Sequence, residues 1–182
     1  MRRTYEVNVI GQVTVLQAML PLLRRARGRV VNLGSIGDRM SIPFGAPIAS
    51  SKAALAAIND SLRMELRPWG IDVVLIEPAS IHTDAVDKLE SAADRSLRAM
   101  GPEGRTLYGE RLRTMVATFA RTERRGSPPE VVADAIHRAL VAPRPRTRYL
   151  VGKDSRRMAL MARWAPPRTL DRLRLRVFGL SA

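Results

Sequence analysis

Three short runs of apolar, β-branched residues, separated by long stretches of helical periodicity, constrain the fold of this chain most. The runs are 29–33 (RVVNL), 71–76 (IDVVLI) and 147–151 (TRYLV). Such continuous apolar runs are typical of strands that are buried on both faces of a parallel sheet. Apolar residues recur at helical spacing in the stretches 47–67 and 131–142. The sequence therefore predicts an α/β fold with about three parallel strands and flanking helices.

Local signals predict where several of these elements begin and end. One helix is expected over 4–25, with Gly28 in the turn that ends it. Ser127 stands three residues before Glu130, the spacing of a capping box, which predicts Ser127 as the cap of the next helix. Residues 84–125 read as two polar helical segments that are broken near Gly101.

A polar stretch from Gly34 to Lys52 follows the first predicted strand and leads into the helix after it. Ser35 comes directly after the strand, and Lys52 lies about one turn into the helix. Open α/β sheets bind their ligands outside the carboxyl ends of their strands. This stretch is therefore the candidate functional site.

The stretch resembles the short-chain dehydrogenase/reductase family, which uses a Ser, a Tyr thirteen residues later, and a Lys four residues after the Tyr. Ser35 and Lys52 match the first and last of these positions, but the Tyr position is occupied by Ile48. In the family the Tyr is the proton donor and acceptor. Ile48 has no ionisable group, so it cannot act as a general acid or base.

The resemblance implies roles for three catalytic-site positions, Asn8, Ser35 and Lys52. Asn8 would hold a water that connects the Lys to solvent, from a local irregularity in its helix, and Ser35 would bind the substrate oxygen. Lys52 would bind the nicotinamide ribose. The alternatives are a polar helix residue at Asn8 and a turn-capping hydroxyl at Ser35. Ser50 and Ser51 are expected to point to other faces of their helix.

The resemblance also implies NAD or NADP as cofactor and a loop that packs against the nicotinamide. Pro78, Ile81 and Thr83 fit that loop, whereas Ala79 replaces a Gly and restricts the backbone if a positive φ is needed there. The family's phosphate-binding Gly-rich turn after a strand does not occur in this sequence.

By the same resemblance, residues 1–152 are expected to form the second half of a doubly wound, Rossmann-like domain. Residues 84–125 would be a lid over the substrate, and 153–182 a basic amphipathic helical tail. The family commonly dimerises through the two helices expected at 4–25 and 47–67, so a homo-oligomer is expected.

Composition limits the other functional classes. The chain has 182 residues, a net charge of +14 and no cysteine, which excludes disulfides and thiolate metal sites. His82 and His137 lack ligand spacing, so no metal site is expected. The arginines are spread over many helices and aromatic residues make up 4 %, which argues for a compositional bias and against nucleic-acid binding. No uninterrupted apolar run suggests a spanning helix, so a cytoplasmic protein is expected.

The tail, over 154–180, alternates apolar residues with arginines. Such a segment can lie on an anionic membrane surface, which would make the protein peripheral to a membrane. It can equally cover the core or a partner subunit.

Two functions remain open from the sequence. The first is an NAD(P)-dependent oxidoreductase acting on alcohols and ketones, similar to retinol or hydroxysteroid dehydrogenases, truncated and impaired in catalysis. The second is a non-catalytic remnant that acts as a binding or dimerisation module.

Overall fold

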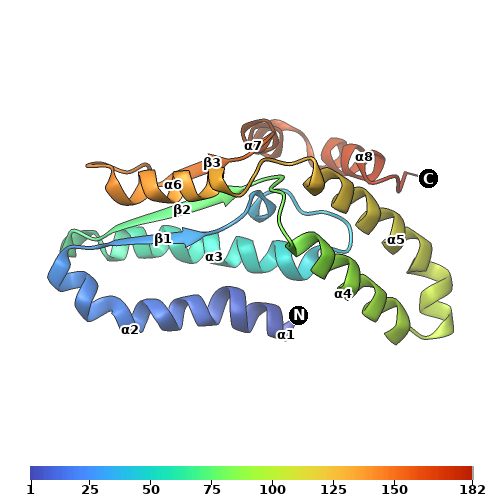
Figure 1. Cartoon of the computed structure of the whole chain (residues 1–182), viewed down its shortest axis with the longest axis horizontal. Helices are drawn as coiled ribbons and strands as arrows, with labels where there is room; N and C mark the ends of the chain where they lie inside the picture. The colour runs from blue at the N-terminus through green and yellow to red at the C-terminus, as the bar shows by residue number, and fades with distance from the viewer. Residues whose placement is uncertain (182) are drawn as a thin grey trace.

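The structure is a computed structural model that describes residues 1–181. Its elements alternate between helices and strands (Figure 1). In chain order they are α1 (Arg2–Tyr5), η1 (Glu6–Ile10), α2 (Gly11–Ala26), β1 (Arg29–Leu33), η2 (Ile36–Asp38), α3 (Ala46–Glu65), η3 (Arg67–Trp69), β2 (Asp72–Pro78), α4 (Ala85–Ala99), α5 (Pro102–Arg124), α6 (Glu130–Val141), β3 (Arg148–Val151), α7 (Ser155–Trp164) and α8 (Pro167–Val177).

The three strands form one parallel sheet in the order β1-β2-β3, as the sequence predicts. Arg29 pairs with Asp72 at the start of β1, and Leu75 pairs with Arg148 at the start of β3. The central strand β2 extends to Pro78, two residues beyond the predicted end, because β3 pairs with it there, whereas the pairing with β1 ends at Ile76.

Helices cover both faces of the sheet, with α2 and α3 on one side and α6 on the other (Figure 1). Alternation along β2 explains this arrangement, because successive side chains point to opposite faces. Val73 packs in a cluster with Leu66 at the end of α3, whereas Val74 packs against Ala135 and Ala139 of α6.

The first helix is continuous from Arg2 to Ala26, but the segment η1 within it is π-helical. The residue with a left-handed conformation at its end is Arg27 (φ 47°), so the prediction that Gly28 ends the helix is off by one position. Gly28 instead donates its N–H to the carbonyl of Leu23 (2.9 Å), and a Cβ there would lie 2.9 Å from the Leu23 side chain.

This same helix, Arg2–Ala26, is long and apolar enough to cross a membrane by length and composition, and its most apolar 18-residue window has a mean hydropathy of 1.3. Asn8 and Gln12 interrupt the apolar run of this helix, so a search for uninterrupted runs does not find it, although its average hydropathy meets the criterion. Core helices of soluble proteins meet the same criterion, and only 6 % of its most apolar window is buried.

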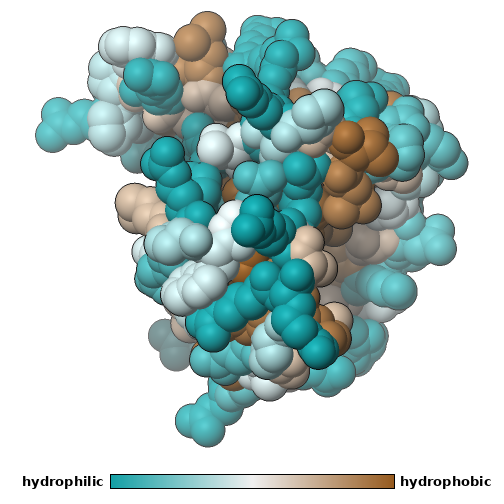
Figure 2. All heavy atoms as spheres, turned by 90° about the vertical axis from the view of Figure 1, so that its left-hand side faces the viewer, coloured by the Kyte–Doolittle hydropathy of each residue, from teal (hydrophilic) through white to brown (hydrophobic). Residues whose placement is uncertain are grey.

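Residues 84–125 form the paired helices α4 and α5, which separate at Met100 and Gly101. Leu97 and Leu112 from this pair form a cluster with Phe178 and Leu180, so the end of the tail covers α4 and α5. The rest of the chain presents a largely hydrophilic surface at the end where the strands begin, with an apolar patch at one side (Figure 2).

The predicted capping box before α6 is not formed. The cap residue of this helix is Pro129, and no side chain caps it. Ser127 accepts a hydrogen bond from the Lys153 N–H instead (2.9 Å), because its backbone already pairs with the loop after β2.

Candidate active site

Ser35 lies directly beyond the carboxyl end of β1, on a short turn. Its backbone is extended (φ −170°) and its Oγ accepts a hydrogen bond from the Gly37 N–H at 3.0 Å. The preceding Gly34 lies so close to β2 that a Cβ would sit 3.0 Å from Leu75 Cδ1. Ser35 therefore does cap a turn, and its hydroxyl proton remains available for donation to another group.

Lys52 reaches the same strand end from α3. Its Nζ donates a hydrogen bond to the carbonyl oxygen of Leu33 at 2.9 Å, two residues before Ser35. Burial lowers the pKa of Lys52 below its ordinary value. The ammonium retains two further N–H donors, which a ribose hydroxyl could accept.

Ile48 lies one turn before Lys52 on α3, and its side chain is 54 % exposed. The residue thus stands on the helix that carries Lys52, but it brings only an aliphatic group. Tyr108 of α5 packs its ring edge-on against Phe44, four residues before Ile48, with 6.4 Å between the ring centroids. Its phenol makes no hydrogen bond to Ser35 or Lys52 within residues 1–181.

Asn8 lies in the middle of the π-helical segment η1, so the irregularity implied by the resemblance is present. Its Nδ2 donates to the Oγ of Ser51 at 3.0 Å, and that Oγ donates in turn to the carbonyl of Ile48 at 2.8 Å. Ser51 is fully buried. The sequence reasoning missed Ser51, because only the approach of η1 to α3 turns its face into the site.

The loop after β2 holds the other predicted residues. Ala79 donates its N–H to Val151 (2.9 Å) without a positive φ, and the left-handed residue is Ser80 (φ 48°). An alanine therefore fits at position 79 without strain. The Ile81 N–H donates to Glu123 of α5 (3.2 Å), and burial raises the pKa of that Glu123 carboxyl.

Pro78 ends β2, and Thr83 lies exposed two residues before α4 begins at Ala85, where its Oγ1 accepts the Ala85 N–H at 3.4 Å. The structure brings Ser35 and Lys52 together at one strand end, and it connects Asn8 to α3 through Ser51. No hydrogen bond joins Thr83 to Lys52 or Ser35 in the described part of the chain.

These residues fit one part of a nicotinamide cofactor. The free donors of Lys52 suit a ribose, and the hydroxyl of Thr83 suits a carboxamide or phosphate. The pyrophosphate has no Gly-rich turn in this sequence.

A buried charge network that the sequence reasoning missed connects the loop after β1 with β2, β3 and α3. Glu77 is fully buried, and its Oε1 accepts hydrogen bonds from Arg39 and Arg148, both at 2.8 Å. Arg148 also contacts Asp60 of α3 (2.6 Å) and Asp38 (3.3 Å). Burial raises the pKa of Glu77, and the nearby Asp38 carboxylate raises it further against the opposing arginines.

A sequence profile described as short chain dehydrogenase matches residues 1–94, which is more than half of the chain. The chain belongs to the short-chain dehydrogenase family. Ser35, Ile48 and Lys52 all lie within the matched residues.

Relatives and solved structures support the same assignment. The chain is 35 % identical to mouse (Mus musculus) retinol dehydrogenase 5, covering 93 % of this chain and 55 % of the relative. It is 37 % identical to rabbit (Oryctolagus cuniculus) 11-beta-hydroxysteroid dehydrogenase type 2, covering 84 % and 39 %. A short-chain dehydrogenase of Burkholderia cenocepacia J2315, solved with NADP, superposes with a TM-score of 0.66 at 20 % identity, covering 97 % and 60 %.

This short-chain dehydrogenase homologue thus spans about half the length of the curated relatives it matches. The partial, Rossmann-like α/β fold predicted from the sequence is confirmed by the solved neighbour and by the parallel sheet.

Proposed function

We propose that this chain carries the substrate side of an NAD(P)-dependent oxidoreductase site for alcohols and ketones of the retinol or hydroxysteroid kind, impaired in hydride transfer. The observation that carries the proposal is the Lys52 ammonium, 2.9 Å from the Leu33 carbonyl and two residues from Ser35. This arrangement puts a cation and a hydroxyl donor at one strand end. The names of the relatives support the substrate class.

In this proposal each residue has a separate task. Ser35 donates its hydroxyl proton to the substrate oxygen, because that Oγ already accepts from Gly37. Lys52 and Thr83 contact the cofactor, and Pro78 and Ile81 shape the loop beside it. The bound nicotinamide would donate or accept the hydride. Asn8 connects the site to solvent beside the Ser51 hydroxyl.

Ile48 is the reason for the proposed impairment. Reduction of a ketone requires a proton for the new alkoxide, and an aliphatic side chain cannot supply it. A well-placed general acid contributes roughly a hundredfold to ten-thousandfold in rate. The chain would then bind substrate and cofactor better than it turns them over.

The alternative function is a non-catalytic module that self-associates through the helices at 4–25 and 47–67. Val15, Met19 and Leu22 of α2 favour it, because they share one helix face and are 45–64 % exposed. An exposed apolar stripe of this kind commonly marks an interface.

For location, we propose a cytoplasmic protein whose tail, residues 153–182, contacts a membrane surface. Leu160 and Trp164 of α7 are exposed beside Arg156 and Arg163. Apolar and cationic side chains on one short helix suit the interface of an anionic bilayer.

Titration of the 182-residue chain with NADH and with NADPH, followed by cofactor fluorescence, tests the main proposal. We expect saturable binding that Lys52→Met weakens about tenfold, the loss of one charge-assisted hydrogen bond. Lys88→Met, a change of the same kind on the exposed face of α4, is the control. Absence of saturable binding, or an equal loss in both variants, would leave only the non-catalytic module.

A further inference from the structure

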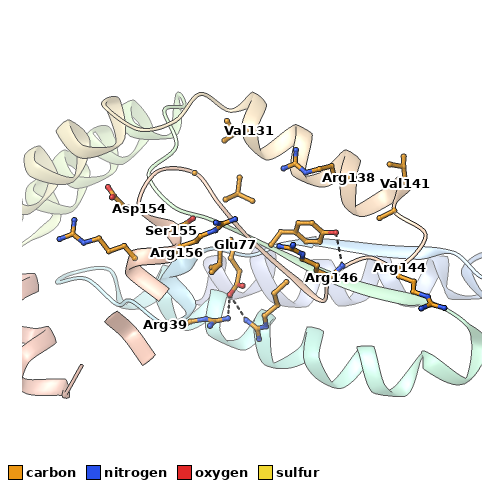
Figure 3. A pocket seen from close by; sticks show the side chains of 17 residues that line it. Arg39, Glu77, Val131, Arg138, Val141, Arg144, Arg146, Asp154, Ser155 and Arg156 are labelled. Atoms are coloured by element: carbon orange, nitrogen blue, oxygen red, sulfur yellow. Dashed lines mark hydrogen bonds and ion pairs between the residues drawn. The ribbon is translucent and has the colours of Figure 1, made fainter. Parts of the chain in front are cut away.

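A large cleft in the described chain lies away from the proposed active site. It has a volume of about 1160 Å³ and runs along the outer edge of β3, between the end of α6 and the start of α7 (Figure 3). Asn8, Ser35, Lys52 and Thr83 do not line it. Whatever this cleft binds is therefore separate from the substrate and nicotinamide.

Positive charge dominates the lining. Seven arginines and two acidic residues, Glu77 and Asp154, face the cleft, an excess of five positive charges. Two of the arginines, Arg39 and Arg148, are neutralised by the Glu77 network at the floor of the cleft. The other five form no ion pair within residues 1–181; they are Arg138, Arg144, Arg146, Arg156 and Arg157.

The five unpaired arginines approach from two sides. Arg138, Arg144 and Arg146 come from the end of α6 and the loop before β3, whereas Arg156 stands at the opposite end with Ser155 (Figure 3). Like charges gathered in one concavity repel one another unless an anion lies between them. Two separated groups suit a ligand with two separated anionic centres.

The two ends of the cleft also differ from an ordinary solvated surface in their backbone groups. Within residues 1–181, β3 pairs with β2 on one side only, so the backbone groups of β3 that are not used in that pairing lie at the outer edge of the sheet. The first turn of α7 contains no acidic residue and no side-chain cap, which leaves N–H donors beside Arg156 and Arg157. Guanidinium forks combined with such donors suit phosphate oxygens.

We propose that this arginine-lined cleft binds a ligand carrying at least two phosphate groups, either free in solution or as the headgroup of a membrane lipid. The carboxylate of Glu77 at the floor of the cleft is paired with Arg39 and Arg148, so it opposes an anion less than a free carboxylate would. The exposed apolar residues Leu160 and Trp164 on α7 would let the same cleft meet a lipid surface.

Calorimetric titration of the full chain with inorganic pyrophosphate, at constant ionic strength near 150 mM, tests the proposal. The pairs Arg144→Gln with Arg146→Gln, and Arg156→Gln with Arg157→Gln, should each weaken binding about tenfold or more. The pair Arg95→Gln with Arg98→Gln on α4 removes the same charge from exposed positions outside the cleft, and should change affinity less than about twofold. Circular dichroism establishes that each variant is folded.

A second arm distinguishes the two sources of phosphate. Vesicles of phosphatidylcholine with phosphatidylinositol 4,5-bisphosphate are compared with phosphatidylserine vesicles of equal charge. Preference for the bisphosphate that both cleft pairs abolish assigns a lipid headgroup, and saturable pyrophosphate binding without that preference assigns a free ligand. No saturable binding to either probe, or equal losses in the cleft and control variants, would overturn the proposal.

Discussion

The Lys52 ammonium donates a hydrogen bond to the carbonyl oxygen of Leu33, so α3 is fastened to the end of β1 immediately before Ser35. This hydrogen bond positions α3 relative to the end of β1, and it therefore sets where the residue at position 48 lies relative to the site.

Restoring the phenol at position 48 should raise turnover. We expect Ile48→Tyr to increase the rate of alcohol oxidation about a hundredfold or more, because Lys52 is already placed to lower the pKa of a phenol on the same helix. The assay follows NADH or NADPH formation with retinol and hydroxysteroid substrates. Ile48→Phe, which has the ring without the hydroxyl, should stay at the parent rate, as should Tyr108→Phe. An equal gain with Phe would show that ring packing, and not acid catalysis, limits the parent chain.

The pKa of Lys52 predicts a pH dependence of stability. Because the folded pKa is lowered from its ordinary 10.5, the unfolded chain binds more protons between the two values. Stability should therefore rise with pH across that window, and Lys52→Met should remove this part of the rise. Urea unfolding of both chains from pH 7 to 10.5 measures the difference. If the free energies of unfolding of the two chains do not differ at any pH, this result would contradict the buried position of the ammonium.

Asn8 and Ser51 should be energetically coupled. The bond between Asn8 Nδ2 and the buried Ser51 Oγ is 3.0 Å long, and removal of either partner costs about 1 kcal/mol in a typical hydrogen bond. A double-mutant cycle with Asn8→Ala and Ser51→Ala should give a coupling of about 0.5–1.5 kcal/mol in the free energy of unfolding. Gln12→Ala, on the same helix one turn away, serves as the uncoupled control. Strict additivity would show that the π-helical segment does not hold Asn8 against α3.

Arg148→Met should destabilise the chain by about 2 kcal/mol or more at pH 7.5, because it leaves the buried Glu77 with only Arg39. The raised folded pKa of Glu77 means that its unfavourable charge appears as pH rises above its ordinary 4.5. The loss should therefore be smaller at pH 4 than at pH 7.5. Arg124→Met breaks exposed ion pairs with Asp87 and Glu90 and should leave the urea midpoint nearly unchanged.

Self-association through α2 should be sensitive to charge at its exposed stripe. Val15→Glu with Met19→Glu places two carboxylates on that face and should shift the chain to a monomer in sedimentation or light scattering. Gln17→Glu adds charge on the same helix outside the stripe and should leave the mass unchanged. A parent chain that is monomeric at high concentration would exclude this interface.

The sequence predicted the strands and the Ser35–Lys52 register well, because both depend on local patterns of β-branched residues and on fixed spacing. The predictions from the sequence failed where segments that are far apart in the sequence compete for one polar group. Ser127 has the spacing of a helix cap, yet its Oγ accepts a hydrogen bond from the N–H of Lys153, 26 positions later in the sequence. Glu77 directly follows the predicted strand 71–76, and only the approach of β3 and of the loop after Ser35 reveals its two arginine partners. The doubt about Ala79 was resolved by Ser80, which takes the left-handed conformation one residue later.

Arg148 belongs to an edge strand of four residues, yet its guanidinium contacts carboxylates on β2 and α3. Short edge strands usually fray and exchange their amide protons quickly. Here the fraying of β3 would have to break the ion pairs of Arg148. The amide protons of β3 should therefore exchange as slowly as those of β2. The end of the sheet would then open together with the centre, as one cooperative unit.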